Sequence, residues 1–461
     1  MSEKQKKKLS VPPSLVIIFL VMVVAAILTW IVPAGEYARF TNDAGQTVVD
    51  PNSFTYVAKN PVNPLAVLKY VFNGMNNARG IIFSLMLCGG GLGIVLGTGM
   101  FQAAAVALGQ KVKGKETVVI ALIMGIFAIL CVPINLNTFI PLAPLGLVTA
   151  AALGFDAIVG VSLIMLGGAV GFSCGAMNLS NTGTAQSIAE LPLFSGMAYR
   201  LVCMIPFYLV AVWYVSRYAK RIREKPESSY VYGVDLGTDY DLSKMPKWEK
   251  KHVPVAVIVV ALLGYLIYMA IEGKMSNETS STLFLYMGVL SGLASRMSLE
   301  DINKSFMNGM KGMATTATLI GFAYAISLIL QDGKIMDTIV HALAGMLNFF
   351  PRVFQAPAMF IMNILVNFLI TSGSGQAATV MPIFVPVADL VGLSRQTAVL
   401  AFNFGDGFCN NILPHAAATM GFVGAAGIPF GKWFSYMIKL FLCWIVVGIV
   451  MLMIATVIGY A

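Results

Sequence analysis

Apolar segments recur along nearly the whole chain and are separated by short polar stretches. A helix that crosses a bilayer needs about 20 consecutive, mostly apolar residues. Segments of this kind, or slightly shorter, lie at residues 14–32, 78–97, 198–215, 253–271, 281–294, 313–330 and 433–458. Amphipathic stretches between them predict helices along the membrane surface at residues 64–77, 101–110, 298–310 and 335–349. The pattern therefore predicts an all-α polytopic membrane protein.

The apolar segment at residues 157–191 is interrupted midway by glycine and polar residues. Glycine and asparagine are poor helix formers, and Ser, Thr and Asn side chains compete for backbone hydrogen bonds. Unwound backbone at membrane depth must face protein or a wet cavity, because lipid cannot satisfy it. We expect a broken helix here, with four polar residues either binding a substrate or only satisfying the kinked backbone: Asn178, Ser180, Asn181 and Thr182.

A second interrupted segment lies at residues 397–423, where the stretch 404–415 carries Asp406, Asn410, Asn411 and His415. An ionised carboxylate at the centre of a membrane helix costs about 2.5–3.5 kcal/mol on insertion scales. A substrate cation, a proton or a neighbouring donor is expected to offset that cost, unless the break lies near the surface and Asp406 is hydrated. His415 is either a proton carrier or a hydrogen-bonded structural residue. Paired broken helices are typical of secondary transporter binding sites.

Two further regions read as re-entrant hairpins, at residues 117–153 and 353–391. In each, two short apolar helices flank a polar tip, which favours a hairpin over two full spans, although full spans also fit the first region. The second tip is alternatively an external loop. The tips place amide, hydroxyl and glycine backbone groups at the depth of the breaks, and the candidate binding residues are Asn135, Asn137, Thr138, Ser372, Gly373, Ser374 and Gly375.

The order of these features indicates an internal repeat. Asn73-Gly74-Met75 recurs as Asn308-Gly309-Met310, a shift of 308−73 = 235 residues, and prolines follow both hairpin tips. The layout places the first copy outside and the second inside, so the halves have opposite orientation. We expect an N-terminal half at 1–216, a cytoplasmic linker at 217–252 and a C-terminal half at 253–461.

Composition agrees with a membrane protein: 58% of residues are hydrophobic, 11% are charged, and the mean hydropathy is +0.81. The net charge of +9 resides in short loops and the N-terminus, where basic residues keep those segments cytoplasmic, so it does not indicate nucleic-acid binding. Six cysteines lack the spacing of a disulfide or zinc framework. Neither a phosphate-binding motif nor a catalytic constellation is visible. We expect no enzyme activity, metal or cofactor beyond Na⁺ or H⁺ as a coupling ion.

Several motifs together resemble the YfcC family of the ion transporter superfamily. They are Trp30-Ile31-Val32-Pro33-Ala34-Gly35-Glu36-Tyr37, residues 154–160 and 191–196, Phe404-Gly405-Asp406-Gly407-Phe408 with Asn410, and residues 427–433. Members are described as basic amino acid (arginine/ornithine-type) antiporters, with relatives that carry C4-dicarboxylates. The resemblance implies a scaffold domain and a transport domain of two hairpins and two broken helices, an elevator movement and a homodimer.

The resemblance also makes Ser180-Asn181-Thr182 similar to the superfamily's Ser-Asn-Thr element, which helps hold cation and substrate. The chain departs from the pattern at Asn135-Leu136-Asn137, where relatives carry acids, and at His415, where they carry a threonine-like residue. Fewer acids at the tip leave Asp406 as the main support for a dibasic substrate.

These observations predict a secondary active transporter in the bacterial inner membrane, with a cytoplasmic N-terminus and a small-molecule substrate. An amino acid such as arginine or ornithine, moved by exchange or ion coupling, is the leading hypothesis. Asp406 would neutralise a substrate amine, a guanidinium or a coupling proton, and the hairpin tips would bind a carboxylate. The alternatives are a Na⁺- or H⁺-coupled carrier of C4-dicarboxylates and, more distantly, a passive channel.

Overall fold

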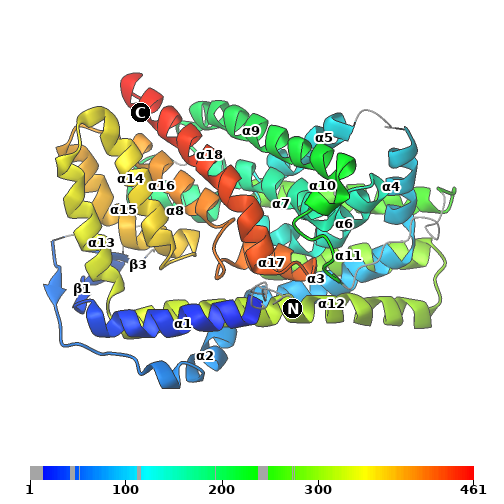
Figure 1. The fold of residues 1–461 in the computed structure, drawn as a ribbon, viewed down its shortest axis with the longest axis horizontal. Coiled ribbons are helices and arrows are strands. Elements are labelled where there is room, and N and C mark those ends of the chain that lie inside the picture. Colours follow the sequence, from blue (N-terminus) through cyan, green and yellow to red (C-terminus); the bar gives the residue numbers. More distant parts are fainter. Residues whose placement is uncertain are drawn as a thin grey trace, which may run out of the picture.

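The computed structural model describes residues 14–41, 47–50, 52–111, 116–192, 194–236, 248–272, 274 and 276–460. These residues are mostly helical and form two packed groups of helices (Figure 1). The basic N-terminus and the middle of the expected linker lie outside the described residues. Four of the described helices, α3, α7, α9 and α18, are by themselves long and apolar enough to cross a membrane.

The first group, the α12 bundle, is built on one long helix. α12 spans Leu299–Asp332 and packs against α1, α2 and α3, while α11 packs against both α3 and α10. Figure 1 shows α1 and α12 along the lower edge of the molecule. The other bounds in this bundle are α1 Ser14–Ile31, η1 Pro64–Ala66, α2 Lys69–Asn77, α3 Arg79–Gly97, α10 His252–Ile271 and α11 Asn277–Ala294.

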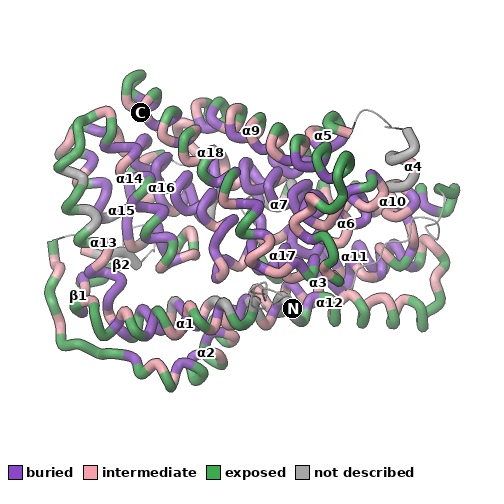
Figure 2. Tube along the Cα trace, viewed as in Figure 1, coloured by how far each residue is buried: buried purple, intermediate pink, exposed green. Residues whose placement is uncertain are grey.

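The second group surrounds two buried helices, α7 (Ala157–Cys174) and α16 (Arg395–Cys409), which Figure 2 shows largely in the colour of buried residues. α7 packs against α5, α6 and α9, and α16 packs against α14, α15 and α18 in the same order along the chain. The bounds are α4 Met100–Lys111, α5 Glu116–Leu130, η2 Leu136–Leu142, α6 Ala143–Ala152, η3 Leu179–Gly183, α8 Thr184–Ile188, α9 Met197–Glu224, η4 Pro226–Ser228, α13 Met336–Gly345, η6 Met346–Phe349, α14 Arg352–Asn367, α15 Gly373–Leu390, α17 Ala417–Ala425 and α18 Phe430–Val457.

The internal repeat extends to the backbone turns that begin α7 and α16. Gly154 and Gly392 both have positive φ, at 76° and 71°, and are separated by 392−154 = 238 residues. The following residue in each half donates its N–H over 2.8 Å to a carbonyl five residues earlier, which is the pattern of a Schellman helix end. Asp156 and Ser394 then cap the next helix with their side chains. The two halves therefore enter their central helices through the same turn.

Glycines on α3 allow this helix to lie directly on α12, as their four-residue spacing predicts. A Cβ atom at Gly89 would lie 2.3 Å from the Met313 Cγ, and one at Gly93 would lie 2.8 Å from the Gly309 Cα. Side chains at these positions would force the two backbones apart. The four-residue spacing of the glycines therefore corresponds to close contact between the two helices.

One prediction about the elements was wrong. Residues 298–310 and 313–330 were expected as a surface helix and a span, but they form the single helix α12. The intervening Lys311-Gly312 is not a strong stop, since a glycine in a helix costs only about 1 kcal/mol. The loop after α1 contains two small antiparallel ladders, which pair β1 Gly35–Glu36 with β4 Thr55–Tyr56 and β2 Arg39–Thr41 with β3 Thr47–Val49.

Candidate functional site

The first interrupted segment consists of an α-helix, a turn, a π-helical turn and a short second α-helix. α7 ends at Cys174, where Gly175 adopts the left-handed conformation with φ 62°, and the π-helical turn η3 follows before α8 begins at Thr184. The side chain of Asn178 accepts a hydrogen bond from the Asn181 N–H and so substitutes for lost helical bonding. The interruption of the helix therefore falls within the stretch that the sequence indicated.

The second interruption begins later than expected. Asp406 lies within helix α16, which continues to Cys409, and the non-helical segment runs from 410 to 416 before α17. The glycines beside Asp406 serve packing instead of unwinding. A Cβ atom at Gly407 would lie 2.4 Å from the Ser173 Oγ, and one at Gly405 would lie 2.4 Å from the Asn363 Cβ. The expectation that Asp406 belongs to unwound chain was wrong, because those glycines are needed for close helix contact.

The tip of the second hairpin region is also more helical than expected. Ser372 is the N-cap of α15, and its hydroxyl accepts a hydrogen bond from the Gly375 N–H over 3.4 Å. Gly373, Ser374 and Gly375 are therefore the first helical turn, and this end of the helix carries a partial positive charge.

A cavity of about 780 Å³ brings the two interruptions and the two tips together. Its inner wall includes residues from η2, η3, α15 and the segment after α16. Eight of the expected binding residues line it: Asn135, Asn137, Asn181, Ser372, Gly373, Ser374, Gly375 and Asn410. The sequence therefore identified most of the polar inner wall, and it missed Thr371, Thr379 and Tyr324.

The other expected site residues lie behind this wall. Thr138, Asn178, Thr182, Asp406, Asn411 and His415 do not line the cavity, and the side chain of Ser180 lies outside the described residues. Asn178 donates to the Asn135 Oδ1 over 3.0 Å, and so supports a residue that does line it. Asn411 donates to the Gly407 and Phe408 carbonyls at the end of α16, which is a structural role.

Asp406 is completely buried, with 0% of its surface exposed. Its Oδ2 accepts a 2.5 Å hydrogen bond from the Asn181 amide, and its Oδ1 accepts one of 3.3 Å from the Asn410 amide. A Cβ atom placed at Gly373 would lie 3.1 Å from the same Oδ2, so the carboxylate is close to the N-terminus of α15. Asn181 and Asn410, which bond the carboxylate, both line the cavity, whereas Asp406 itself does not.

The hydrogen bonds continue from Asp406 to residues that the sequence did not single out. Asn403 donates to the Asn181 Oδ1 over 2.6 Å, and Arg200 donates to the Asn403 Oδ1 over 2.5 Å. Both residues are completely buried. One signal in the sequence could have identified Arg200, because it is a lone basic residue at the start of a long apolar segment.

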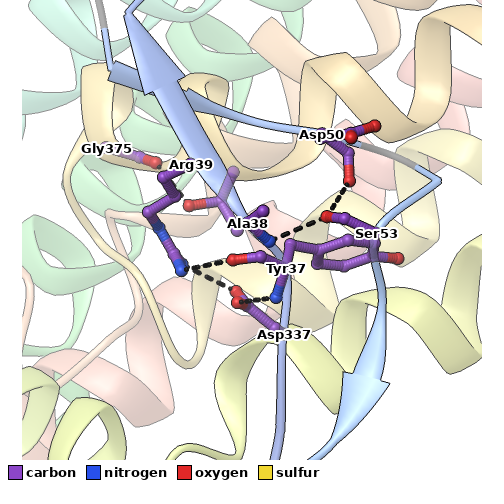
Figure 3. Close-up of polar contacts among 8 residues, drawn as sticks. Tyr37, Ala38, Arg39, Asp50, Ser53, Asp337 and Gly375 are labelled. Carbon is purple, nitrogen blue, oxygen red and sulfur yellow. Dashed lines mark hydrogen bonds and ion pairs between the residues drawn. The ribbon is translucent and has the colours of Figure 1, made fainter.

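Charged residues at the mouth of the cavity form a second cluster, which connects the loop after α1 to the start of α13. Arg39 pairs with Asp337 over 2.9 Å, and the Tyr37 N–H donates to the same carboxylate over 3.0 Å (Figure 3). Lys334 pairs with Glu36 over 3.2 Å. Burial, and then the charge of Asp337, raise the pKa of Tyr37 to about 12. We call these five residues the outer clasp.

The sequence profile of the DcuC family, described as C4-dicarboxylate anaerobic carriers, matches residues 11–457. The chain belongs to this family. It is also 28% identical over 479 residues to the Escherichia coli K12 protein named "Putative basic amino acid antiporter YfcC", with 93% of each chain covered.

Two solved transporter structures are similar at lower identity. The YdaH transporter of Alcanivorax borkumensis is 16% identical with a TM-score of 0.45, and covers 97% of this chain and 99% of its own. MtrF of Neisseria gonorrhoeae, from a class of antimetabolite efflux pumps, is 15% identical with a TM-score of 0.45, and covers 97% and 95%.

Membership of a carrier family makes this chain a membrane transporter and not an enzyme. It has a small-molecule substrate and works in a lipid bilayer. The family description names C4-dicarboxylates, whereas the relative's name refers to basic amino acids. The charges around the cavity are therefore compared with both kinds of substrate.

Proposed function

We propose that this protein is a secondary active transporter of an amino acid, with arginine and ornithine as the leading substrates, in the bacterial inner membrane. It works by exchange or by coupling to Na⁺ or H⁺. The two interruptions and the two hairpins lie at membrane depth in this proposal, with the halves in opposite orientation. The hairpins and broken helices move as a transport domain against a dimeric scaffold built on the α12 bundle.

The observation that carries the proposal is the pairing of opposite electrostatic ends at the cavity wall. The N-terminus of α15 favours an anion, and the Asp406 carboxylate lies 3.1 Å from the position of a Cβ atom at Gly373 in that same turn. An α-amino acid carries both a carboxylate and an ammonium group a few bonds apart. The wall therefore suits a substrate with both charges.

The first turn of α15 is suited to the substrate carboxylate. The N–H groups of Gly373 and Ser374 begin the helix and have no carbonyl partner within it, and the residues Ser372 and Ser374 are exposed at the wall. Asn137 lines the same cavity and adds an amide donor. Hydrogen bonds to a charged acceptor are roughly twice as strong as neutral ones, which makes this turn an effective carboxylate site.

Asp406 acts on the substrate cation through Asn410 in this proposal. Asn410 lines the cavity, and its amide donates to the carboxylate. Charges interact much more strongly in a low-dielectric interior than in water, so a buried carboxylate stabilises an amine or guanidinium held one amide away. Asp406 is also the group that takes up a coupling Na⁺ or proton, and His415 is a second proton carrier.

A C4-dicarboxylate carrier is the second candidate, and the family description favours it. Such a substrate has two carboxylates and would need two cationic or donor-rich ends. Among the described residues, the cationic side chains that line the cavity are Arg39 and Lys334, and both are paired with acids in the outer clasp. This charge distribution favours a substrate with one carboxylate. A passive channel, a more distant candidate, would give flux that does not saturate.

The test is uptake by the purified protein in proteoliposomes, with arginine, ornithine, succinate and fumarate as substrates, each with and without a Na⁺ or proton gradient. We expect saturable arginine or ornithine uptake that an internal amino acid accelerates. Thermal stabilisation should rise with ligand concentration over the dissociation constant. Uptake of succinate alone would support the dicarboxylate candidate, and non-saturating flux would support a channel.

A further inference from the structure

Arg200 is a completely buried arginine, one turn into α9. Its guanidinium contacts the side-chain oxygens of Asn403 and Gln396 and the Gly175 carbonyl, and forms no ion pair with a described carboxylate. Arginine stays protonated in proteins. A buried charge without a paired charge is costly, so Arg200 needs a structural or functional reason to be here.

Three hydrogen bonds connect this cation to the Asp406 carboxylate. Arg200 donates to Asn403 over 2.5 Å, Asn403 donates to Asn181 over 2.6 Å, and Asn181 donates to Asp406 over 2.5 Å. The four residues come from α9, α16 and η3, and all are buried. We call this path the amide chain.

The chemistry of the two ends fixes the direction of the amide chain. An asparagine amide donates from one side and accepts on the other, so by itself it fits in either orientation. A guanidinium only donates, so Asn403 must turn its oxygen toward Arg200 and its nitrogen toward Asn181. Asn181 must then turn its nitrogen toward Asp406. An ionised carboxylate only accepts, so both ends agree on the same direction.

We propose that Arg200 is a positioning residue for Asp406, which sets the direction of the amide chain and thereby keeps the carboxylate ionised. If the side chain at position 200 can accept as well as donate, both amides are free to turn. Asn181 can then present its oxygen to Asp406, which favours a protonated carboxyl that donates. The proposal deepens the proposed function, since it concerns how the acid assigned to substrate and ion coupling keeps its charge.

The other described groups around the Asp406 carboxylate carry no positive charge that would keep it ionised. The described side chains bonded to the carboxylate are the neutral Asn181 of η3 and Asn410 on the adjoining segment, and the neighbouring turn of α15 contributes Gly373. Among the described residues, the titratable side chain of Cys409, on the same helix and buried, also interacts with Asp406. In the part of the chain that the structure describes, none of these contacts places a cation directly at the carboxylate.

The experiment is infrared spectroscopy of the purified protein in lipid, titrated with acid and no substrate. The carbonyl stretch of a protonated carboxyl reports on Asp406, and its absence from Asp406→Asn identifies the band. We expect Arg200→Gln to show the band at least about one pH unit higher than wild type, a tenfold change in proton binding. Arg200→Lys keeps a side chain that only donates and should titrate close to wild type.

A second pair of variants separates direction from charge, and carries the test if Arg200→Gln does not fold. Asn403→Asp places an acceptor at both sides of that position, so Asn181 must turn and the Asp406 band should appear at higher pH. Gln396→Glu adds the same charge at another Arg200 contact, 3.5 Å away, but leaves the amide chain intact. The band of this control variant should stay near wild type.

Equal shifts in Asn403→Asp and Gln396→Glu would overturn the proposal, since charge alone would explain them. The proposal would also be overturned if the Asp406 band of Arg200→Gln appeared at the same pH as in the wild type. The sample contains no substrate, so the result does not depend on which solute the protein carries. A protein that fails to transport amino acids can still show the predicted shift, and the two proposals can therefore fail separately.

Discussion

Asn178 donates a 3.0 Å hydrogen bond to Asn135, and so joins the first interruption to the first hairpin tip. The second half contains a corresponding link with the opposite donor direction, in which Asn367 at the end of α14 donates a 3.0 Å hydrogen bond to Asn410 in the interruption. The partners are separated by 178−135 = 43 residues in one half and by 410−367 = 43 in the other. The internal repeat therefore reaches the side chains at the cavity, and each hairpin is tied to its own interruption.

The two links give the first prediction. Asn178→Ala and Asn367→Ala should each lower stability by about 0.5–1.5 kcal/mol for the lost hydrogen bond. The two effects should be similar, because each amide makes a second hydrogen bond: Asn178 accepts from the Asn181 N–H over 3.0 Å, and Asn367 donates to the Asp406 carbonyl over 3.1 Å. Thermal unfolding measures stability, and proteoliposome uptake should fall in both. Normal uptake in both variants would show that these links do not organise the site.

The second prediction concerns the close contact of α16 with α7. Gly407→Ala would put a Cβ atom 2.4 Å from the Ser173 Oγ and 2.5 Å from the Ser173 Cα, so a backbone must shift. Overpacking of this kind costs about 1–3 kcal/mol. The control is Gly312→Ala in α12, where no atom lies within 4 Å of the added Cβ and helix propensity improves by about 1 kcal/mol. A higher melting temperature for Gly407→Ala than for Gly312→Ala would contradict this packing.

Much of the architecture could be predicted from hydrophobic periodicity, and α1, α3, α10 and α18 begin and end close to the expected residues. The polar tips and interruptions also identified eight residues of the cavity wall. Sequence reasoning placed Asp406 in unwound chain because glycine has two uses, flexibility and close packing, and local sequence does not distinguish them. Asn403 and Arg200 were missed because their role depends on contacts between residues about 200 positions apart.

The outer clasp gives the third prediction. Asp337 is buried and accepts from both Arg39 and the Tyr37 N–H, whereas Arg39 is partly exposed. Arg39→Ala should change stability by at most about 1 kcal/mol, as exposed ion pairs usually do. Asp337→Ala leaves a buried donor unpaired and should cost about 1–3 kcal/mol. Asp337→Asn keeps an acceptor for Tyr37 and should be intermediate. Equal melting temperatures for all three variants would exclude Asp337 as the centre of the clasp.

Alkaline pH should weaken the same clasp. The pKa of Tyr37 is raised to about 12, so its neutral form is favoured in the folded protein. That stability is fully present below the ordinary tyrosine pKa near 10 and is lost as the pH rises through about 12. The melting temperature of the wild type should therefore fall more steeply between these values than that of Tyr37→Phe. Parallel curves would mean that Tyr37 does not contribute to alkaline unfolding.

The central claim is that a buried acid beside the α15 helix N-terminus forms an amino acid site. Asp406→Asn preserves the shape of this side chain and removes its charge. The most direct measurement is arginine and ornithine uptake by this variant in proteoliposomes, at matched protein incorporation and with a melting temperature recorded alongside. The account predicts saturable uptake by the wild type and none by a folded Asp406→Asn protein. Equal amino acid uptake by the two proteins would contradict it.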